Sequence, residues 1–356
     1  MNSEQGGLVN GPGNPYPNVV RRFGPTQLLV LLAGGLVLWL AVAGLSLCVG
    51  SNGLLGWPNA TTRGIRLDSV KLASLIGAAL AAAGVVCQTV LRNPLADPYL
   101  LGVSSGATLL AFVWRSTAVA TMLGPAGFAL GQQGFAFVGG IGAAGAVFII
   151  AGRRGRLEPI TLLLTGVIVN AVAASCYLLL NALWRDRPGA GDPITLLVGS
   201  INTTVLRADW YLVVAVVLVG CALLQALAGQ LNAMVLSEAE AQSLGIGVQQ
   251  LRWLVLGIAS LVTASAVALS GPIGFVGLIC PHLARGIVGP DVRRLLPVSI
   301  AAGAIVLCIA DAAARMLAGL HSVSTVLPVG VLTGLLGGPF FLWLLLHRQR
   351  RCCDAD

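Results

Sequence analysis

Ten apolar stretches, separated by shorter polar segments, fill this chain between residues 27 and 347. An α-helix needs about 20 apolar residues to cross the hydrocarbon of a bilayer, and most of these stretches come close to that length. They predict an all-α polytopic membrane protein with about ten transmembrane helices. The expected helices cover residues 27–49, 69–91, 103–122, 132–152, 159–184, 210–228, 251–270, 273–288, 295–318 and 329–347.

Two of the polar segments predict broken helices. Residues 92–109 read RNPLADPYLLGVSSGATL, and Pro94 and Pro98 must stop the helix that precedes them. Residues 270–289 read SGPIGFVGLICPHLARGIVG, with Pro272 near the start. Backbone groups freed by such breaks have no partners in lipid, so each segment must be buried in protein or line an aqueous path. The first segment is therefore a candidate gate.

The composition fits this membrane class. Hydrophobic residues make up 56% of the 356 positions and charged residues 10%, whereas soluble domains carry roughly 25% charged residues. The mean hydropathy is +0.89. Three regions are expected: a disordered cytoplasmic tail at 1–26, a transmembrane domain at 27–347 and a basic cytoplasmic tail at 348–356.

The positive charge indicates the orientation of the chain. Ten helices with both termini in the cytoplasm place 13 of the 21 lysines and arginines on the inner side, as the positive-inside rule requires. The net charge of +8 is then explained by topology and by a partner at the outer surface, and no nucleic acid is expected as a partner.

A short helix is expected between the sixth and seventh predicted spans. Ser237 and Glu240 form a capping box, and Gly245 follows the expected last residue, Leu244. A helix from Glu238 to Leu244 is too short to be stable alone, so it must pack on another surface. The membrane surface and a partner protein fit equally well.

One charged pair falls within a predicted span. Asp311 and Arg315 lie four residues apart, on one face of the ninth helix. Charges inside a membrane segment are costly and usually paired. The pair therefore either neutralises itself or holds the arginine for an acidic partner at the outer surface, where Arg66 and Lys71 can join it.

The fifth predicted span is polar but uncharged at Thr161, Thr165, Asn170 and Asn181. A path lined in this way suits a bulky, partly apolar solute better than a proton or a metal ion. Hydrogen bonding between helices explains the same residues equally well.

Motifs of enzyme chemistry are missing from the sequence. It contains no Walker A motif, so this chain hydrolyses no ATP, and it contains neither H-E-x-x-H nor G-x-S-x-G. The eight cysteines fit neither a disulfide framework nor a metal site. We expect a transport protein without a cofactor. A secondary carrier that works alone would need an intramembrane proton or sodium site.

Five sequence blocks, in order, resemble the permease subunits of bacterial ABC importers for iron-siderophores, haem and cobalamin. The resemblance covers about residues 27–347. The blocks read RNPLADPYLLGVSSGA (92–107), LSEAEAQSLGI (236–246), SGPIGFVGLICPHLAR (270–285), ADAAAR (310–315) and LPVGVLTGLLGGPFFLWLL (327–345). The resemblance implies a homodimer in the bacterial inner membrane, with two ATP-binding cassette ATPase subunits and an outer substrate-binding protein as partners.

The resemblance also implies roles for particular residues. In the family, the loop after the second helix closes the cytoplasmic end of the path, the fifth helix lines the path, the loop helix docks on the ATPase, and outer arginines meet carboxylates of the binding protein. The positions that match the gate are Asn93 and Leu95, and those that match the path are Thr161 and Thr165, with Asn170 on the same helix. The positions that match the ATPase contact are Glu238, Ala241, Leu244 and Gly245, with the cap residue Ser237. Arg66 and Arg315 match the arginines that meet the binding protein.

The chain departs from the family pattern at three positions. Ser69 and Val326 stand where a second arginine and an acidic residue are common, so the outer docking surface is expected to differ from the family pattern at these two positions. Ser237 replaces a common glycine, a change that fits the capping box.

The expected function follows from the resemblance together with the uncharged fifth span. The chain is predicted to translocate an iron chelate, either haem or a ferric siderophore, with ATP hydrolysed by the partner subunit. Cobalamin is the alternative substrate, and an ion-coupled secondary carrier is the rival from a different class.

Overall fold

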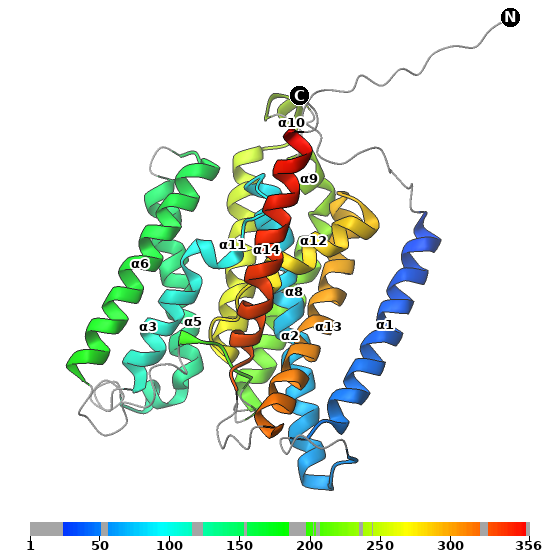
Figure 1. Cartoon of the computed structure of the whole chain (residues 1–356). Coiled ribbons are helices and arrows are strands. Elements are labelled where there is room, and N and C mark those ends of the chain that lie inside the picture. Colours follow the sequence, from blue (N-terminus) through cyan, green and yellow to red (C-terminus); the bar gives the residue numbers. More distant parts are fainter. Residues whose placement is uncertain are drawn as a thin grey trace, which may run out of the picture.

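The computed structural model describes residues 24–50, 56–115, 124–152, 155–184, 197–201, 203, 207–234, 238–243, 245–320 and 327–353. The regular elements in these ranges are helices, and the long ones stand side by side (Figure 1). The long helices are α1 (Pro25–Cys48), α2 (Ala60–Val90), α3 (Val103–Arg115), α5 (Gly124–Ala151), α6 (Pro159–Leu183), α8 (Arg207–Ala226), α11 (Val248–Ser270), α12 (Val276–Val288), α13 (Val292–Leu320) and α14 (Val329–Cys353). Three short helices join them: η1 (Pro98–Leu101), α9 (Ala228–Ala233) and α10 (Glu238–Ser243).

The prediction of an all-α polytopic membrane protein is confirmed. Within the described ranges, six helices are long and apolar enough to cross a bilayer, and four shorter apolar helices lie among them. The six are Thr26–Cys48, Ala60–Val90, Gly131–Ala151, Pro159–Leu183, Val248–Ser270 and Val292–Gly319. The four are Val103–Trp114, Trp210–Ala226, Val276–Val288 and Val329–Leu342.

The predicted start of the second helix, residue 69, is wrong. Helix α2 begins at Ala60, and its first turns carry Arg63, Arg66 and Asp68. Figure 1 shows this end of α2 reaching beyond most of its neighbours. Hydropathy detects only the part of a helix that meets hydrocarbon, so these polar turns did not register.

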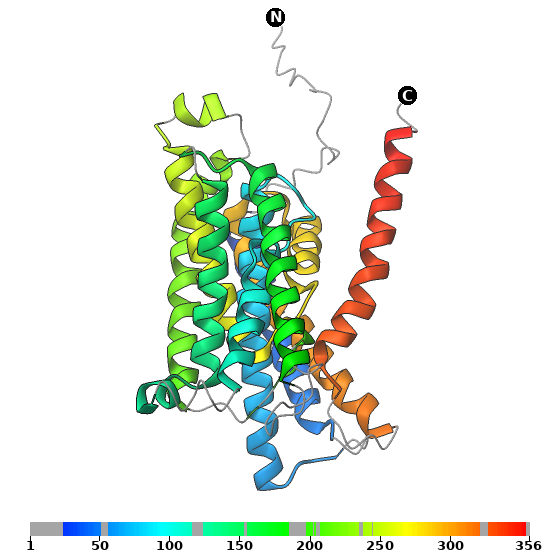
Figure 2. The same ribbon diagram turned by 90° about the vertical axis from the view of Figure 1, so that its left-hand side faces the viewer.

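The two ends of the bundle carry different elements. Helix α10, the start of α1 and the C-terminal part of α14 lie at the same end of the bundle, which we call the α10 end (Figures 1 and 2). The end of α1, the start of α2 and the end of α13 lie at the opposite end, which we call the Asp311 end. Towards the α10 end, α14 leans away from the other helices (Figure 2).

The core is built on close backbone contacts of α2. A Cβ atom added to Gly84 would lie 1.9 Å from the carbonyl oxygen of Gly277 in α12, and one added to Gly77 would lie 2.1 Å from that of Gly303 in α13. Lipid gives helices no hydrophobic reason to associate, so small residues that permit close packing hold the bundle together. Most of α2 beyond Ile76 is buried in this way.

The Gly84→Ala variant tests this contact. Alanine normally stabilises a helix interior relative to glycine, but here its methyl group has no room, so we expect a net loss of about 1–3 kcal/mol. The measurement is the thermal unfolding midpoint of the purified protein. Gly145→Ala is the matched control, because nothing lies within 4 Å of its added Cβ. Equal midpoints for the two variants would contradict the packing described here.

Candidate transport path and coupling elements

The two broken segments predicted from the sequence meet at the centre of the molecule. The hydroxyl group of Tyr99 in η1 donates to the carbonyl oxygen of Ile273 and accepts from its N–H, both at 2.9 Å. The carboxylate of Asp97 accepts from the N–H of Tyr99 at 2.9 Å and from that of Phe275. The first broken segment, which is the link between α2 and α3, therefore satisfies backbone groups that the second, the link between α11 and α12, leaves free.

Asp97 lies in the link between α2 and α3, outside the spanning helices. Burial raises the pKa of its carboxyl group to about 6, and the two N–H groups act against that rise. Its side-chain oxygen serves as the acceptor for the N–H of Tyr99.

A third segment, residues 197–201, closes over the second link. The N–H of Gly199 donates to Pro272 at 2.9 Å, and the N–H of Ser200 donates to Ser270 at 2.7 Å. The carbonyl oxygen of Gly199 accepts from Gly330 in the first turn of α14, also at 2.9 Å. The start of α14 is thus joined to the same central assembly.

A cavity of about 270 Å³ opens beside these links, and its lining mixes hydroxyl, amide and apolar groups. Its lining residues are Ser104, Ser105, Thr108, Asn170, Ala174, Tyr177, Leu197 and Pro272. The amide nitrogen of Asn170 donates to the carbonyl oxygen of Tyr99 at 2.8 Å, and its oxygen accepts from Ser105 at 2.5 Å. Asn170 of α6 therefore joins the cavity to the link between α2 and α3.

The structure separates the predicted path residues of α6. Asn170 lines the cavity, whereas Thr165 is buried one turn earlier and Thr161 is exposed, where its hydroxyl donates to Glu158 at 3.3 Å. Sequence reasoning missed Ser104, Ser105 and Thr108 as lining residues. Their signal was the hydroxyl-rich run S-S-G-A-T that follows Gly102.

The predicted gate residues form a tight turn at the α10 end of α2. The side-chain oxygen of Asn93 accepts from the N–H of Leu95 at 3.0 Å, and its carbonyl oxygen accepts from Ala96, also at 3.0 Å. An asparagine that bonds the backbone two residues on stabilises a turn in this way.

The predicted loop helix is present as α10 (Figure 2). Ala241 is 1% exposed and belongs to the apolar core at this end, so the helix packs on its own chain. Gly245 follows with a φ of +77°, and the N–H of Ile246 returns to the carbonyl oxygen of Ala241 at 3.2 Å. Ser237 and Leu244 lie outside the described residues, so the capping box and the last predicted residue of the helix remain expectations.

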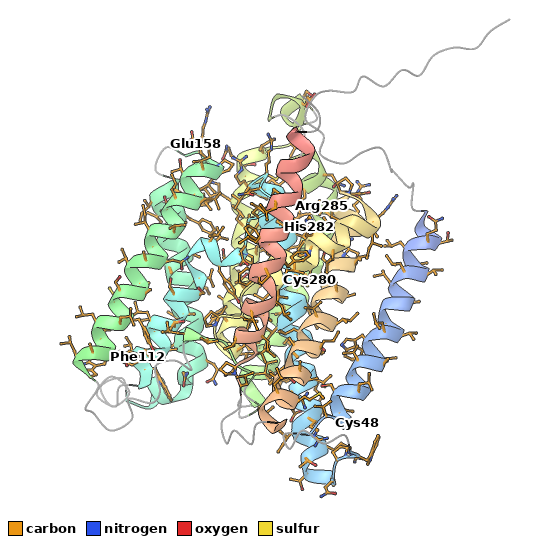
Figure 3. All side chains as sticks on the ribbon, in the orientation of Figure 1. Cys48, Phe112, Glu158, Cys280, His282 and Arg285 are labelled. Carbon is orange, nitrogen blue, oxygen red and sulfur yellow. The ribbon has the colours of Figure 1, made fainter. Side chains whose placement is uncertain are left out.

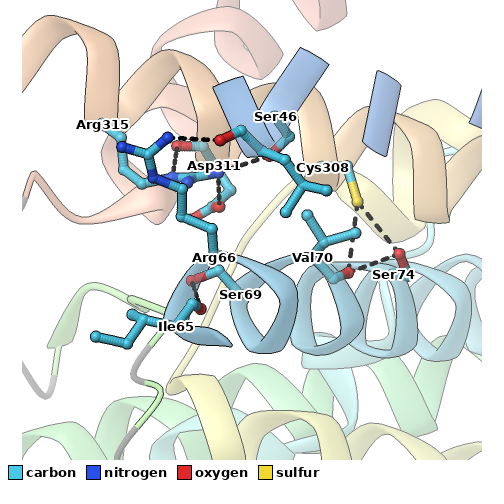
Figure 4. A network of polar contacts seen from close by, with 10 residues as sticks. Ser46, Ile65, Arg66, Ser69, Val70, Ser74, Cys308, Asp311 and Arg315 are labelled. Atoms are coloured by element: carbon cyan, nitrogen blue, oxygen red, sulfur yellow. Dashed lines mark hydrogen bonds and ion pairs between the residues drawn. The ribbon is translucent and has the colours of Figure 1, made fainter. Parts of the chain in front are cut away.

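The predicted outer cations meet at the end of α1 (Figure 4). Arg315 pairs with Asp311 at 2.8 Å and donates to the hydroxyl of Ser46 at 2.6 Å. Arg66 donates to the carbonyl oxygen of Leu47 at 2.5 Å. The last carbonyls of a helix favour cations, so both arginines stabilise the end of α1.

Two of these cations differ from the expectation in detail. The side chains of Arg315 and Asp311 are only 13% and 7% exposed, so this pair is largely internal. Lys71 pairs instead with exposed Asp68, at 3.0 Å. Lys71 therefore stands outside the Arg315 network.

Side chains that bind metals are scattered over the molecule. Figure 3 shows Cys280 and His282 on α12 and Cys48 at the far end of α1. Among the described residues, no group of three or more His, Cys, Asp or Glu residues could hold a metal ion.

An all-α membrane bundle with meeting broken links, a polar cavity beside them and a short helix at one end defines a membrane transport protein. Residues 38–347 match the FecCD transport family, and the chain belongs to this family. It is a permease subunit of an ABC importer, and ATP hydrolysis belongs to a separate subunit.

Characterised relatives and a solved structure agree with the family. The chain is 41% identical to the cobalamin import system permease BtuC of Halobacterium salinarum, over 81% of this chain and 73% of that protein. It is 39% identical to the hemin transport system permease HmuU of Yersinia pestis, over 81% and 83%. A solved metal-chelate type ABC transporter in an inward-facing conformation matches with a TM-score of 0.74 and 29% identity, over 90% of this chain and 99% of that one.

The Asp311–Arg315 pair can be tested by breaking it and then removing it. Asp311→Asn leaves a buried guanidinium without its countercharge, and we expect a loss of about 3–5 kcal/mol in stability. The double variant Asp311→Asn, Arg315→Met removes both charges and should recover part of that loss. The thermal unfolding midpoint is the readout. A double variant less stable than the single one would show that the pair does not depend on mutual neutralisation.

Proposed function

We propose that this importer permease carries a bulky metal chelate, and that the chelate is an iron complex, either haem or a ferric siderophore. The observation that carries the proposal is the lining of the 270 Å³ cavity, where hydroxyl and amide groups of Ser104, Ser105, Thr108 and Asn170 stand beside apolar residues. Such uncharged groups suit a large, partly apolar solute, because the lining presents no charge that the solute would have to neutralise in order to pass.

Cobalamin is the second candidate substrate. Its support is the 41% identity to a relative that is named a cobalamin import permease, against 39% for the relative named for hemin. A secondary carrier has less support. Asp311, the acidic residue within α13, is held by Arg315 and is not available as a simple proton site.

We place the path between two copies of the chain, with α6 along it and the gate at Asn93 and Leu95. Helices α6 and α14 expose apolar faces that a second copy and lipid can cover, including Ile160, Ile168 and Leu335. Thr161 is exposed on α6, and Asn170 reaches the cavity. Buried Thr165 would meet the solute only after α6 shifts.

We assign the α10 end to the cytoplasm, which places both termini there. The proposed ATPase contact consists of the coupling helix and its flanks, Ser237, Glu238, Ala241, Leu244 and Gly245. Burial of Ala241 fixes this helix to the core, so a force applied to α10 moves the body of the permease. The basic residues of the C-terminal tail agree with this orientation.

We assign the Asp311 end to the binding protein. Arg66 is half-buried and Arg315 is more enclosed, so carboxylates of the binding protein would reach Arg66 first. Attraction between these carboxylates and Arg66 would lower the energy of one conformation of the permease relative to the other. Docking of the binding protein would then shift the equilibrium between the two conformations.

The proposal is tested by substrate-stimulated ATP hydrolysis. The chain is reconstituted in liposomes with the ATPase and binding protein encoded beside it, and haem, ferric siderophores and cobalamin are added in turn. We expect one iron chelate to stimulate hydrolysis several-fold over the binding protein alone. Stimulation by cobalamin alone would support the second candidate, and the absence of any stable ATPase complex would contradict an importer permease.

The Glu238→Arg variant tests the coupling helix. Reversing the charge at the first residue of α10 should disturb the ATPase contact, so that ATP hydrolysis no longer drives uptake. Co-purification of the ATPase and uptake per ATP hydrolysed are measured together. Normal uptake in this variant would count against the assignment.

A further inference from the structure

We propose that two arginine-to-carbonyl contacts tie the segments on either side of the coupling helix to the gate and to the start of α6, and that movement of α10 reaches the transport path through them. The contacts are Arg92 to Met234 and Arg252 to Leu157. The inference rests on the proposed function, because it requires that an ATPase acts on α10. It makes Arg92 and Arg252 positioning residues, which act on the path without touching the solute.

The first contact joins the gate to the segment before α10. Arg92 is the residue that precedes Asn93, and its φ of +48° turns the chain out of α2. Its guanidinium donates through Nε and Nη2 to the carbonyl oxygen of Met234, at 3.1 and 2.9 Å. Met234 is the C-cap residue of α9, four residues before Glu238 begins α10. Two bonds from one planar group to one oxygen fix direction as well as distance.

The second contact joins the segment after α10 to α6. Arg252, in the second turn of α11, is 3% exposed and donates through Nη1 to the carbonyl oxygen of Leu157. Gln249, in the first turn of α11, accepts from the N–H of the same Leu157 at 3.0 Å. Both backbone groups of Leu157 are therefore held by α11. Leu157 lies two residues before α6 begins.

The two contacts lie on one continuous apolar core. Ala96 behind the gate, Leu157 and Leu162 at the base of α6, Met234, and Ala241 of α10 belong to the same buried cluster. Closely packed groups of this kind transmit displacement, because they cannot be compressed independently. A push on α10 therefore moves the gate turn and the base of α6 together.

The Asp311 end has a different construction. Its arginines hold the end of α1 to α2 and α13, and among the described residues neither Arg66 nor Arg315 bonds to the gate turn or to α10. The α10 end can thus rearrange when the ATPase acts on it, while the end of α1 stays bound to α2 and α13 at the opposite end.

Arg92→Gln is the decisive variant. Arg92 is exposed, so its replacement removes the contact to Met234 with little loss of folding stability. We expect normal ATPase binding and ATP hydrolysis within about twofold of wild type, but uptake reduced about tenfold, so that ATP consumed per chelate rises about tenfold. Arg92→Lys, which keeps a donor but not the two-pronged geometry, should restore part of the uptake.

Arg156→Gln is the matched control. It removes an exposed arginine at the same end of the molecule, next to Leu157, without removing either contact. We expect wild-type uptake, wild-type ATP consumption and the same thermal unfolding midpoint as Arg92→Gln. Hydrogen exchange gives a direct readout: addition of nucleotide should change protection of residues 93–97 in the wild type and in Arg156→Gln, but not in Arg92→Gln.

The outcomes separate this inference from the function on which it rests. Wild-type coupling and an unchanged ATP-to-chelate ratio in Arg92→Gln would overturn the inference and leave the proposed function intact. An equal fall of uptake and ATP hydrolysis would show a merely structural role and overturn it as well. The absence of ATP-dependent uptake in the wild type would contradict the proposed function itself, and the inference would fall with it.

Discussion

The structure depends on how it satisfies backbone groups that its own broken helices set free. A helix that stops within a membrane protein leaves N–H and C=O groups that lipid cannot satisfy. Here the hydroxyl of Tyr99 serves both backbone groups of Ile273, and Asp97 takes the N–H groups of Tyr99 and Phe275. Irregular backbone is stable at the centre of this bundle because each link is the partner of another. The cavity lies beside this assembly, and Asn170 both lines the cavity and donates to the carbonyl oxygen of Tyr99.

This central assembly divides the molecule into two working ends. At the Asp311 end, arginines are committed to the end of α1 and to an internal carboxylate, which gives a fixed platform. At the α10 end, contacts run from the segments on either side of the loop helix to the gate turn and to Leu157, just before α6. The proposed function places a binding protein at the first of these ends and an ATPase at the second, and the two ends differ in construction in keeping with that proposal.

Much of the fold follows from sequence, because the signals are local. Apolar length predicted the spans, and Pro94, Pro98 and Pro272 marked the broken links. The contact of Tyr99 with Ile273 could not be predicted, since it joins positions 174 residues apart and depends on how helices pack. The start of α2 was missed because its first turns are polar. The burial of Thr165 and the internal position of Arg315 likewise depend on neighbouring helices, which periodicity within one helix does not reveal.

The central claim is that ATP, not an ion gradient, drives a chelate through this permease. The most direct test is uptake of a labelled ferric chelate or haem into liposomes that contain the permease and its ATPase, with ATP on the α10 side and the binding protein on the other. Ionophores collapse all ion gradients during the assay. The account predicts uptake that requires both ATP and the binding protein and survives the ionophores. Uptake that proceeds without ATP and stops when the gradients collapse would contradict it.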